Sequence, residues 1–418
     1  MGFACSYLAN RTLSDQLFAD IPANDTGLII IIPAFDEPGI IFTLNSLLKC
    51  KNPPCPVEVI ILVNAPVSAG ISQIEQNNIS ISELVSWKKD NKDAFINLLF
   101  YNAGIQDNPR WGVGMARKMA MDEALRRFSN ISNPGGVIVS LDADCRVSEN
   151  YLEELYDQLY KRSDRKACSI YFEHPLEGDL PRSVYNAITQ YELHLRYYYQ
   201  ALKYTGYPWV FQTVGSAIAV KAEAYARAGG MSKRQGAEDF YFIQKLIPAE
   251  GYFYLNKATV MPSPRISDRV PFGTGPVIAK MIVGDEMSYM TYNTEGFEYL
   301  KLFFDKINLL YDSDMNFSGR IVEDLHNSLQ EFLAENDWMG KLSEIKNNTA
   351  TMAAFRKRFF NWFNMFRMVK YMNLLHSGRY LSKIPVEKAA GDFLGKTGKP
   401  SEYDNVRELL EIYRAMER

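Results

Sequence analysis

The sequence predicts an α/β fold in which helices cover a mostly parallel central sheet. Short β-branched runs alternate with helical patterns through the first half of the chain. Polar loops containing Pro and Gly follow several of these runs at their carboxyl ends. Strands that alternate with helices form sheets covered on both faces, and such sheets bind ligands at the carboxyl ends of their strands. We therefore expect a binding site in these loops.

The individual elements can be placed along the chain. Four apolar runs are expected to form buried strands, at 28–32, 57–63, 96–101 and 136–141. Helical patterns follow the first and third of these runs, over 40–48 and 114–128. From about residue 285 the strand signal fades and long helical patterns dominate, so we expect a helical region after a soft boundary near 290.

Composition excludes several classes of protein. The chain has 418 residues, of which 47% are hydrophobic, enough for a large core. A net charge of -3 argues against a nucleic-acid-binding protein. The five cysteines are scattered, which argues against a disulfide framework or zinc ribbon and favours a reducing compartment. No run approaches the roughly 18 apolar residues of a membrane-spanning helix. We expect a cytoplasmic protein.

An acidic triplet follows the fourth expected strand. Asp142 and Asp144 lie one residue apart directly after the run 137–141, where two carboxylates can face one open site. Mg²⁺ and Mn²⁺ prefer oxygen ligands and often keep substrate phosphates in their coordination shell. The triplet therefore fits a metal site for a diphosphate. An acidic turn that caps the helix beginning near Glu149 is the alternative.

Arg117 lies on the helix that precedes the acidic strand. It offers a cation for a phosphate, or for orienting a carboxylate. Its segment, Gly112 to Lys118, lacks the G-x-G-x-x-G spacing and does not follow a strand directly, which argues against a dinucleotide-binding dehydrogenase.

Four blocks of sequence together resemble a known family. They are Ile32-Pro-Ala-Phe-Asp-Glu37, Gly114-Met-Ala-Arg-Lys118, Leu141-Asp-Ala-Asp144, and Gly215 to Gly230 with Glu238-Asp239 behind it. Their order resembles the inverting family 2 glycosyltransferases, which have the glycosyltransferase A-type fold with a Rossmann-like, mostly parallel sheet. The resemblance covers roughly residues 28–250. It implies a catalytic domain over 1–289, with a nucleotide-sugar half at about 27–145 and an acceptor half at about 146–289, followed by a helical region over 290–418.

The resemblance also implies an activity. Such enzymes move a hexose from a nucleotide diphosphate sugar to an acceptor hydroxyl, in the synthesis of cell-surface polysaccharides or glycoconjugates. Asp142 and Asp144 would hold Mn²⁺ or Mg²⁺. Pro33, Ala34, Asp36 and Glu37 would line the pocket for the donor base and ribose. Asn64 stands where the family usually has an acidic pair, which leaves a UDP-linked or a GDP-linked donor open.

An acidic pair provides the candidate base. Transfer with inversion needs one carboxylate to deprotonate the acceptor hydroxyl, and by resemblance that residue is Asp239. Neighbouring residues diverge by about 100° on a helix, so Glu238 is expected to orient the acceptor or the base. Gly215 would let the donor or the acceptor approach the backbone closely. The alternative for the acidic pair is a favourable position at a helix N-terminus.

Two further segments are open to two interpretations each. Arg265 and Arg269 lie in a loop that could close over the diphosphate or form an exposed salt-bridged turn. Between residues 345 and 386 there are eight basic and no acidic residues, interleaved with aromatic residues. This segment could contact the inner face of a membrane and a lipid-linked acceptor, or pack against the catalytic domain or a second copy of the chain.

Other functions remain open beside the leading one. A nucleotidyltransferase needs a Gly- and Arg-rich loop after the first strand, and Pro33-Ala-Phe-Asp-Glu does not fit this requirement. A retaining transferase acting on a small phosphorylated acceptor could use Arg265 and Arg269. A sugar-nucleotide-binding protein without turnover is the non-enzymatic alternative.

Overall fold

A computed structural model describes residues 2–234, 236–267, 273–284, 288–399 and 402–418. Within these residues the chain divides into two compact units. The first unit comprises Met1–Ile188, Phe211–Gly284 and Glu417–Arg418. The second comprises Thr189–Val210 and Asp285–Met416.

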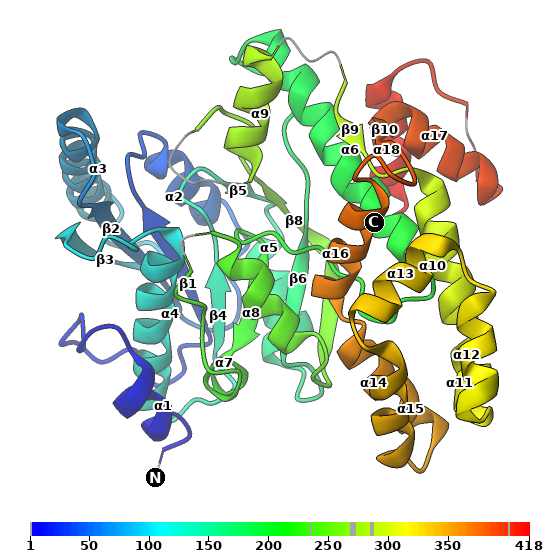
Figure 1. Cartoon of the computed structure of the whole chain (residues 1–418). Coiled ribbons are helices and arrows are strands. Elements are labelled where there is room, and N and C mark those ends of the chain that lie inside the picture. Colours follow the sequence, from blue (N-terminus) through cyan, green and yellow to red (C-terminus); the bar gives the residue numbers. More distant parts are fainter. Residues whose placement is uncertain (1, 235, 268–272, 285–287, 400–401) are drawn as a thin grey trace. The chain divides into compact units, whose positions relative to one another are not determined.

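A mixed sheet forms the centre of the first unit (Figure 1). Among the described residues its strand order is β3-β2-β1-β4-β7-β6-β8-β5. The strands are β1 (Leu28–Ala34), β2 (Val57–Pro66), β3 (Ile96–Gln106), β4 (Val137–Ser140), β5 (Arg146–Val147), β6 (Ala167–Phe172), β7 (Ile218–Lys221) and β8 (Tyr252–Met261). Of these described strands, β7 and β5 run antiparallel to their neighbours and the others are parallel to one another. The predicted α/β class and the mostly parallel sheet are confirmed.

Continuous apolar runs account for the central strands. All seven residues of β1 are buried, as are the first nine of β2, because both faces of these strands are covered. β1 pairs in parallel with β2 on one side and with β4 on the other. All four predicted strands are present, and β2 and β3 extend several residues beyond their predicted ends. The carboxyl ends of these strands lie at one edge of the sheet.

Helices precede, separate and follow these strands along the chain. They are α1 (Cys5–Arg11), α2 (Ile40–Leu48), α3 (Ile71–Asp90), α4 (Val113–Asn130), α5 (Tyr151–Leu155) with a π-helical turn at Tyr156–Tyr160, α6 (Arg182–Tyr204), α7 (Ala222–Arg227), α8 (Glu238–Leu246) and α9 (Thr274–Val283). The residues of α6 from Thr189 onward belong to the second unit. Helix α4 packs on β1, β2 and β4. Its small side chains Ala116, Ala120 and Ala124 are fully buried, which allows close approach to the strands. The position of α4 therefore places Arg117 beside the end of β4.

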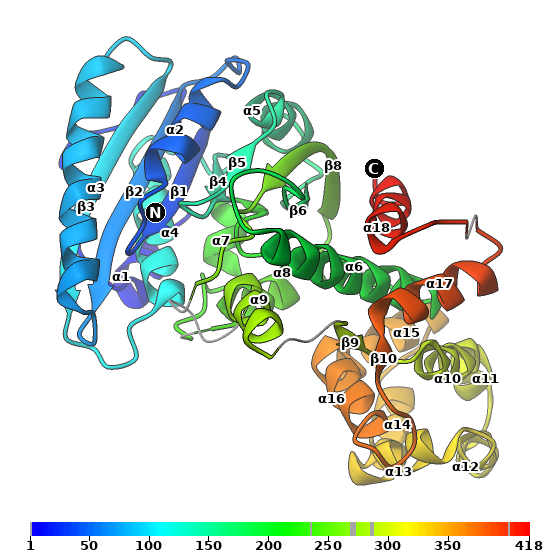
Figure 2. The ribbon, with the colours of Figure 1, turned by 90° about the horizontal axis from the view of Figure 1, so that it is seen from above.

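The second unit contains the predicted helical region (Figure 2). Its helices are α10 (Thr294–Asp305), α11 (Ile307–Asp312), α12 (Met315–Glu323), α13 (Asn327–Glu335), α14 (Trp338–Asn347), α15 (Met352–Trp362), α16 (Met365–Leu375), α17 (Val386–Lys396) and α18 (Val406–Ala415). A short ribbon joins β9 (Met290–Thr291) to β10 (Ile384–Pro385). The helical C-terminal region is thus confirmed.

Aromatic side chains form the core of the second unit. Phe359 and Phe363 pack against Phe303, at ring distances of 5.5 and 5.7 Å. The ring of Trp362 lies 4.7 Å from that of Trp338, at a tilt of 35°. The aromatic residues interleaved with the basic ones of segment 345–386 are therefore largely buried inside this unit. Within the described ranges, none of the helices combines the length and the apolar character that crossing a bilayer requires.

Candidate active site

The carboxyl edge of the sheet brings the predicted site residues of the first unit together. Asp36 and Glu37 follow β1, Asp142 and Asp144 follow β4, and Arg265 follows β8. Strand β7 runs antiparallel to β4, so it begins at this edge and places Gly215 there as well. Residues that are far apart in the sequence are therefore neighbours, because β1, β4 and β8 end at this edge and the antiparallel β7 begins there.

Arg117 joins two of the predicted acidic residues. Its Nη2 donates to Asp142 Oδ1 at 2.7 Å, and its Nη1 pairs with Glu238. The Arg117 side chain is only 3% exposed, whereas that of Asp142 is 38% exposed. Burial lowers the Arg117 pKa, but the neighbouring carboxylates Asp142, Glu238 and Asp239 outweigh burial and raise it. Arg117 is consequently a fixed positive charge beneath a solvent-facing aspartate.

Two glycines allow the surrounding segments to approach Arg117. A Cβ on Gly215 would lie 2.9 Å from Asp239 Oδ2 and 3.0 Å from Arg117 Nη1. A Cβ on Gly114 would lie 2.2 Å from the carbonyl oxygen of Arg234 and 2.8 Å from Glu238 Cγ. Neither position has room for a side chain. The glycines thus bring α4, α8 and the segment before β7 into contact around the acidic pair.

The acidic pair begins helix α8. Ala237, the residue before it, has a φ of 56°, a left-handed conformation that costs a non-glycine residue roughly 1–2 kcal/mol. Asp239 Oδ1 accepts a hydrogen bond from the amide of Phe240 at 2.7 Å. Burial raises the pKa of both Glu238 and Asp239, while the charge of Arg117 opposes the rise. A carboxylate with a raised pKa is suited to accepting a proton near neutral pH.

A second arginine contacts the other aspartate of the triplet. Arg265 Nε lies 3.4 Å from Asp144 Oδ2, and its Nη2 pairs with Glu37. Glu37 is only 2% exposed, and its other carboxylate oxygen accepts from the amide of Gly39 at 2.9 Å. The hydrogen bond from Gly39 therefore orients the Glu37 carboxylate so that its second oxygen faces the Arg265 guanidinium. Arg269, predicted beside Arg265, lies outside the described residues.

The residues predicted to line the nucleotide pocket differ in accessibility. Pro33 and Ala34 are buried within β1. Asn64 is 5% exposed, donates to the carbonyl oxygen of Ala34 at 3.0 Å and accepts from Trp111 Nε1 at 2.8 Å. The amide of Asn64 thus holds Trp111 against the ends of β1 and β2. Asp36 is partly exposed, with a left-handed φ of 52°.

Sequence reasoning did not identify several residues that support the site. Asn77 on α3 accepts from the amide of Asp36 at 2.9 Å and donates to the carbonyl oxygen of Asn64 at 2.9 Å. Thr43 on α2 donates to the carbonyl oxygen of Ala143, the middle residue of the triplet, at 2.7 Å. Single Thr and Asn side chains in helices carry no distinctive spacing, so only the fold identifies their roles.

The acidic triplet can provide part of a metal site. Among the described residues no group of three His, Cys, Asp or Glu side chains could hold a metal ion. Asp142 and Asp144 supply hard oxygen donors, and both carboxylates reach the surface. Mg²⁺ is commonly bound by one or two carboxylates together with water and substrate phosphates. The pair therefore fits a metal whose shell is completed by a diphosphate, and it does not fit a site built by protein ligands alone.

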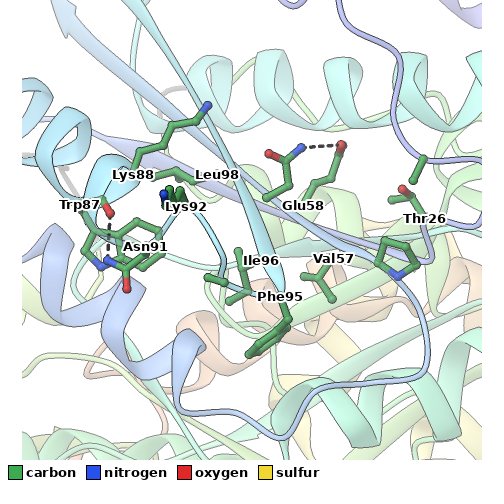
Figure 3. Close-up of a pocket in the computed structure, with 14 residues that line it drawn as sticks. Thr26, Val57, Glu58, Trp87, Lys88, Asn91, Lys92, Phe95, Ile96 and Leu98 are labelled. Carbon is green, nitrogen blue, oxygen red and sulfur yellow. Dashed lines mark hydrogen bonds between the residues drawn. The ribbon is translucent and has the colours of Figure 1, made fainter.

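One cavity among the described residues lies at the opposite edge of the sheet, and Figure 3 shows the residues that line it. Its volume is about 310 Å³, and its walls include Val57 and Ile96, which begin β2 and β3. Glu58 in its wall pairs with the buried guanidinium of Arg127 and accepts from Asn97. This cavity is thus separated from the predicted site residues by the length of the strands.

Comparisons with known proteins return distant structural similarities only. No family model matches the chain, and no curated protein matches it. One solved structure, S. aureus TarS 1-349 in complex with UDP-GlcNAc, has 12% identity and a TM-score of 0.40, covering 91% of this chain and 94% of that one. The mannosyltransferase PcManGT from Pyrobaculum calidifontis, in complex with GDP-Man and Mn²⁺, has 13% identity and a TM-score of 0.37, covering 99% and 91%.

A third structure is glucosyl-3-phosphoglycerate synthase from Mycobacterium tuberculosis, in complex with Mn²⁺, UDP and phosphoglyceric acid. It has 14% identity and a TM-score of 0.36, covering 69% of this chain and 84% of that one. TM-scores of this size do not decide the chemistry of a site.

Proposed function

We propose that this chain is a metal-dependent glycosyltransferase of the A-type fold. The enzyme would move a hexose from a UDP- or GDP-linked sugar to an acceptor hydroxyl, with inversion at the anomeric carbon. The reaction would belong to the synthesis of cell-surface polysaccharides or glycoconjugates. The observation that carries the proposal is the contact of Arg117 with both Asp142 and Glu238. Through this contact, the aspartate proposed to bind the metal and the donor diphosphate lies beside the acidic pair that contains the proposed base.

The proposed roles follow from the positions of the side chains. Asp142 and Asp144 would hold Mn²⁺ or Mg²⁺ with the donor diphosphate, and the metal would supply positive charge to the leaving group. Asp239 would take the proton of the acceptor hydroxyl as its oxygen bonds to the anomeric carbon. The bond from that carbon to the diphosphate oxygen breaks, and its electron pair leaves with the diphosphate. Asp239 suits this role because it is partly exposed beside the backbone of Gly215.

Glu238 would act on the base through Arg117. Its side chain is buried and paired with Arg117, so it is positioned to fix the guanidinium. The guanidinium in turn favours ionised Asp239, because it opposes the effect of burial on that carboxylate. We propose Glu238 as a positioning residue, whereas Asp239 contacts the acceptor.

The same proposal assigns the parts of the chain. Residues 27–145 would bind the nucleotide sugar, 146–289 would bind a saccharide or lipid-linked acceptor, and 290–418 would form the helical region. Exposed basic residues of that region, such as Lys357, Arg358 and Lys370, would provide the contact with a membrane surface or a second copy.

A thermal-shift screen tests the proposal. UDP- and GDP-sugars are added with and without Mn²⁺, because a ligand that binds only the folded chain raises its melting temperature. We expect one nucleotide series to stabilise the protein only with Mn²⁺, and Asp144→Asn to lose this shift. If no sugar nucleotide stabilises the protein with Mn²⁺, the proposed function is wrong. Proton NMR of the product then reads the anomeric configuration, and retention would replace the inverting mechanism.

A further inference from the structure

An arginine joins each aspartate of the acidic triplet to a buried glutamate. The two bridges are Asp142–Arg117–Glu238 and Asp144–Arg265–Glu37. The arginines differ in their freedom to move. Arg117 lies within the regular helix α4 and is 3% exposed, whereas Arg265 lies in the irregular segment after β8 and is 24% exposed. Arg265 can therefore exchange partners without disrupting a helix.

The guanidinium of Arg265 competes with a metal ion for Asp144. Its Nε lies 3.4 Å from Asp144 Oδ2. A divalent metal ion binds a carboxylate oxygen at roughly 2.0–2.6 Å. Two cations at one carboxylate repel each other, and the repulsion is stronger in a partly buried site than in water. Asp144 therefore cannot hold both cations at full strength.

Glu37 holds Arg265 in this position. The Glu37 carboxylate is buried and already accepts from the amide of Gly39, and its main chain is fixed by a hydrogen bond from Ser80 Oγ to the Glu37 carbonyl oxygen at 2.9 Å. Breaking an ion pair of a buried carboxylate is costly, because the carboxylate has already lost its hydration. Departure of Arg265 from Glu37 is thus opposed, which keeps the guanidinium beside Asp144.

A diphosphate changes the balance between these two cations. Guanidinium groups pair well with phosphate oxygens, so Arg265 gains a second anionic partner when a diphosphate lies beside the triplet. We propose that Arg265 couples metal binding at Asp144 to diphosphate binding, by disfavouring the metal alone and favouring the metal together with the diphosphate. This inference rests on the proposed function. Because coupling between two ligands is reciprocal, the metal raises the affinity for the diphosphate by the same factor.

Mn²⁺ titrations of the full chain test the coupling. Free Mn²⁺ is measured by electron paramagnetic resonance, without nucleotide and with saturating UDP or GDP. We expect Arg265→Ala to bind Mn²⁺ alone about tenfold more tightly than the wild type, because one competing charge is removed. The enhancement by the nucleoside diphosphate should shrink in the same variant. Arg265→Gln, which removes the charge and keeps most of the side-chain volume, gives the same comparison if the alanine variant does not fold.

Two further variants complete the design. Arg162→Ala removes the guanidinium of an exposed pair with Asp164 and should leave both Mn²⁺ affinities unchanged. Glu37→Gln weakens the hold on Arg265 and should tighten binding of Mn²⁺ alone, by less than Arg265→Ala does. Thermal unfolding of each variant confirms that it is folded.

The outcomes separate the inference from the function on which it rests. Loss of Mn²⁺ binding in Asp144→Asn, measured with nucleotide, would support the metal site. If Arg265→Ala and Arg265→Gln then bind Mn²⁺ alone no more tightly than the wild type, the coupling role of Arg265 is wrong although the metal site remains. If the wild type shows no Asp144-dependent Mn²⁺ binding with UDP or GDP, both the coupling and the proposed metal site are wrong.

Discussion

Replacement of Gly215 tests whether the acidic pair and Arg117 form one site. A Cβ at this position would lie 2.9 Å from Asp239 Oδ2 and 3.0 Å from Arg117 Nη1, whereas ordinary contacts begin at 3.4 Å. One of these groups must therefore retreat by about half an ångström. Arg117 is held between Asp142 and Glu238, so Asp239 is the group expected to move.

The expected cost follows from the size of this displacement. Misplacing a reacting group by about 1 Å can lower a rate about 100-fold, so we expect Gly215→Ala to lower kcat/KM by roughly 10- to 100-fold. Overpacking should also destabilise the fold by about 1–3 kcal/mol. The assay is release of nucleoside diphosphate from the sugar nucleotide that the thermal-shift screen identifies. Rates are divided by the folded fraction obtained from denaturant unfolding.

Two glycine variants serve as controls. Gly395→Ala places its methyl group in open space within helix α17, so it should leave the rate unchanged and raise the stability by no more than about 1 kcal/mol. Gly136→Ala places its Cβ 2.3 Å from Phe128, away from the site, and should destabilise the fold while the rate per folded molecule is kept. Wild-type kcat/KM in folded Gly215→Ala would refute the assignment of Asp239 and Arg117 to one reacting centre.

Three further predictions follow from individual side chains. Arg117→Met should destabilise the fold by about 3–5 kcal/mol in denaturant unfolding, because it leaves the buried Glu238 without its partner; an unchanged midpoint would contradict the bridge. Burial raises the pKa of Glu238 and Asp239, so kcat/KM should begin to decrease at a higher pH than an ordinary carboxyl group would cause as the solution is acidified. Asp239→Asn removes the base and should lower the rate about 100- to 10,000-fold. Burial lowers the pKa of His194 to about 3 in the folded chain. Between pH 6.5 and 3 the unfolded chain therefore binds a proton at this imidazole that the folded chain does not bind. The free energy of unfolding should fall by about 1.4 kcal/mol for each pH unit as the pH drops through this range. His194→Gln should lose that slope, and its stability at pH 8 should fall because the ring contacts of His194 with Tyr289 and Tyr191 are lost.

The central strands were predictable because they are buried on both faces. The run at 28–32 contains only apolar, mostly β-branched residues, and such a pattern has few alternatives to a central strand. Strands β6, β7 and β8 were not placed individually. β7 has only four residues, Ile218–Lys221, and β8 mixes buried, partly exposed and exposed positions, whereas β6 is buried throughout but contains the mixed sequence Ala-Cys-Ser-Ile-Tyr-Phe. Their pairing depends on contacts that are distant in the sequence.

The site was predictable to the level of residue types. Asp142 and Asp144 were expected at the end of a strand because parallel strands present their carboxyl ends at one edge. The partners of these residues were not predictable. Arg265 reaches Glu37 across more than two hundred residues of sequence, and the pairing of β8 with β6 and with β5 brings its segment to the site.

The role of Asn64 also required the structure. Its position after the predicted strand at 57–63 suggested contact with a base, but its amide is used by Ala34 and Trp111. A buried amide whose groups already have partners within the protein has little capacity to bind a ligand. Base recognition is therefore expected from groups nearer the surface, such as the partly exposed Asp36.

The most direct test of the proposed function is the metal dependence of donor turnover. Purified chain is incubated with UDP- and GDP-sugars, with Mn²⁺ or with a chelator, and release of the nucleoside diphosphate is measured. We predict release from one nucleotide series with Mn²⁺ only, and at least a 100-fold loss in Asp144→Asn, in line with the loss of one electrostatic group from a reacting centre. Release that continues at the wild-type rate in Asp144→Asn, or that is unaffected by the chelator, would contradict the assignment of the acidic triplet to a metal diphosphate.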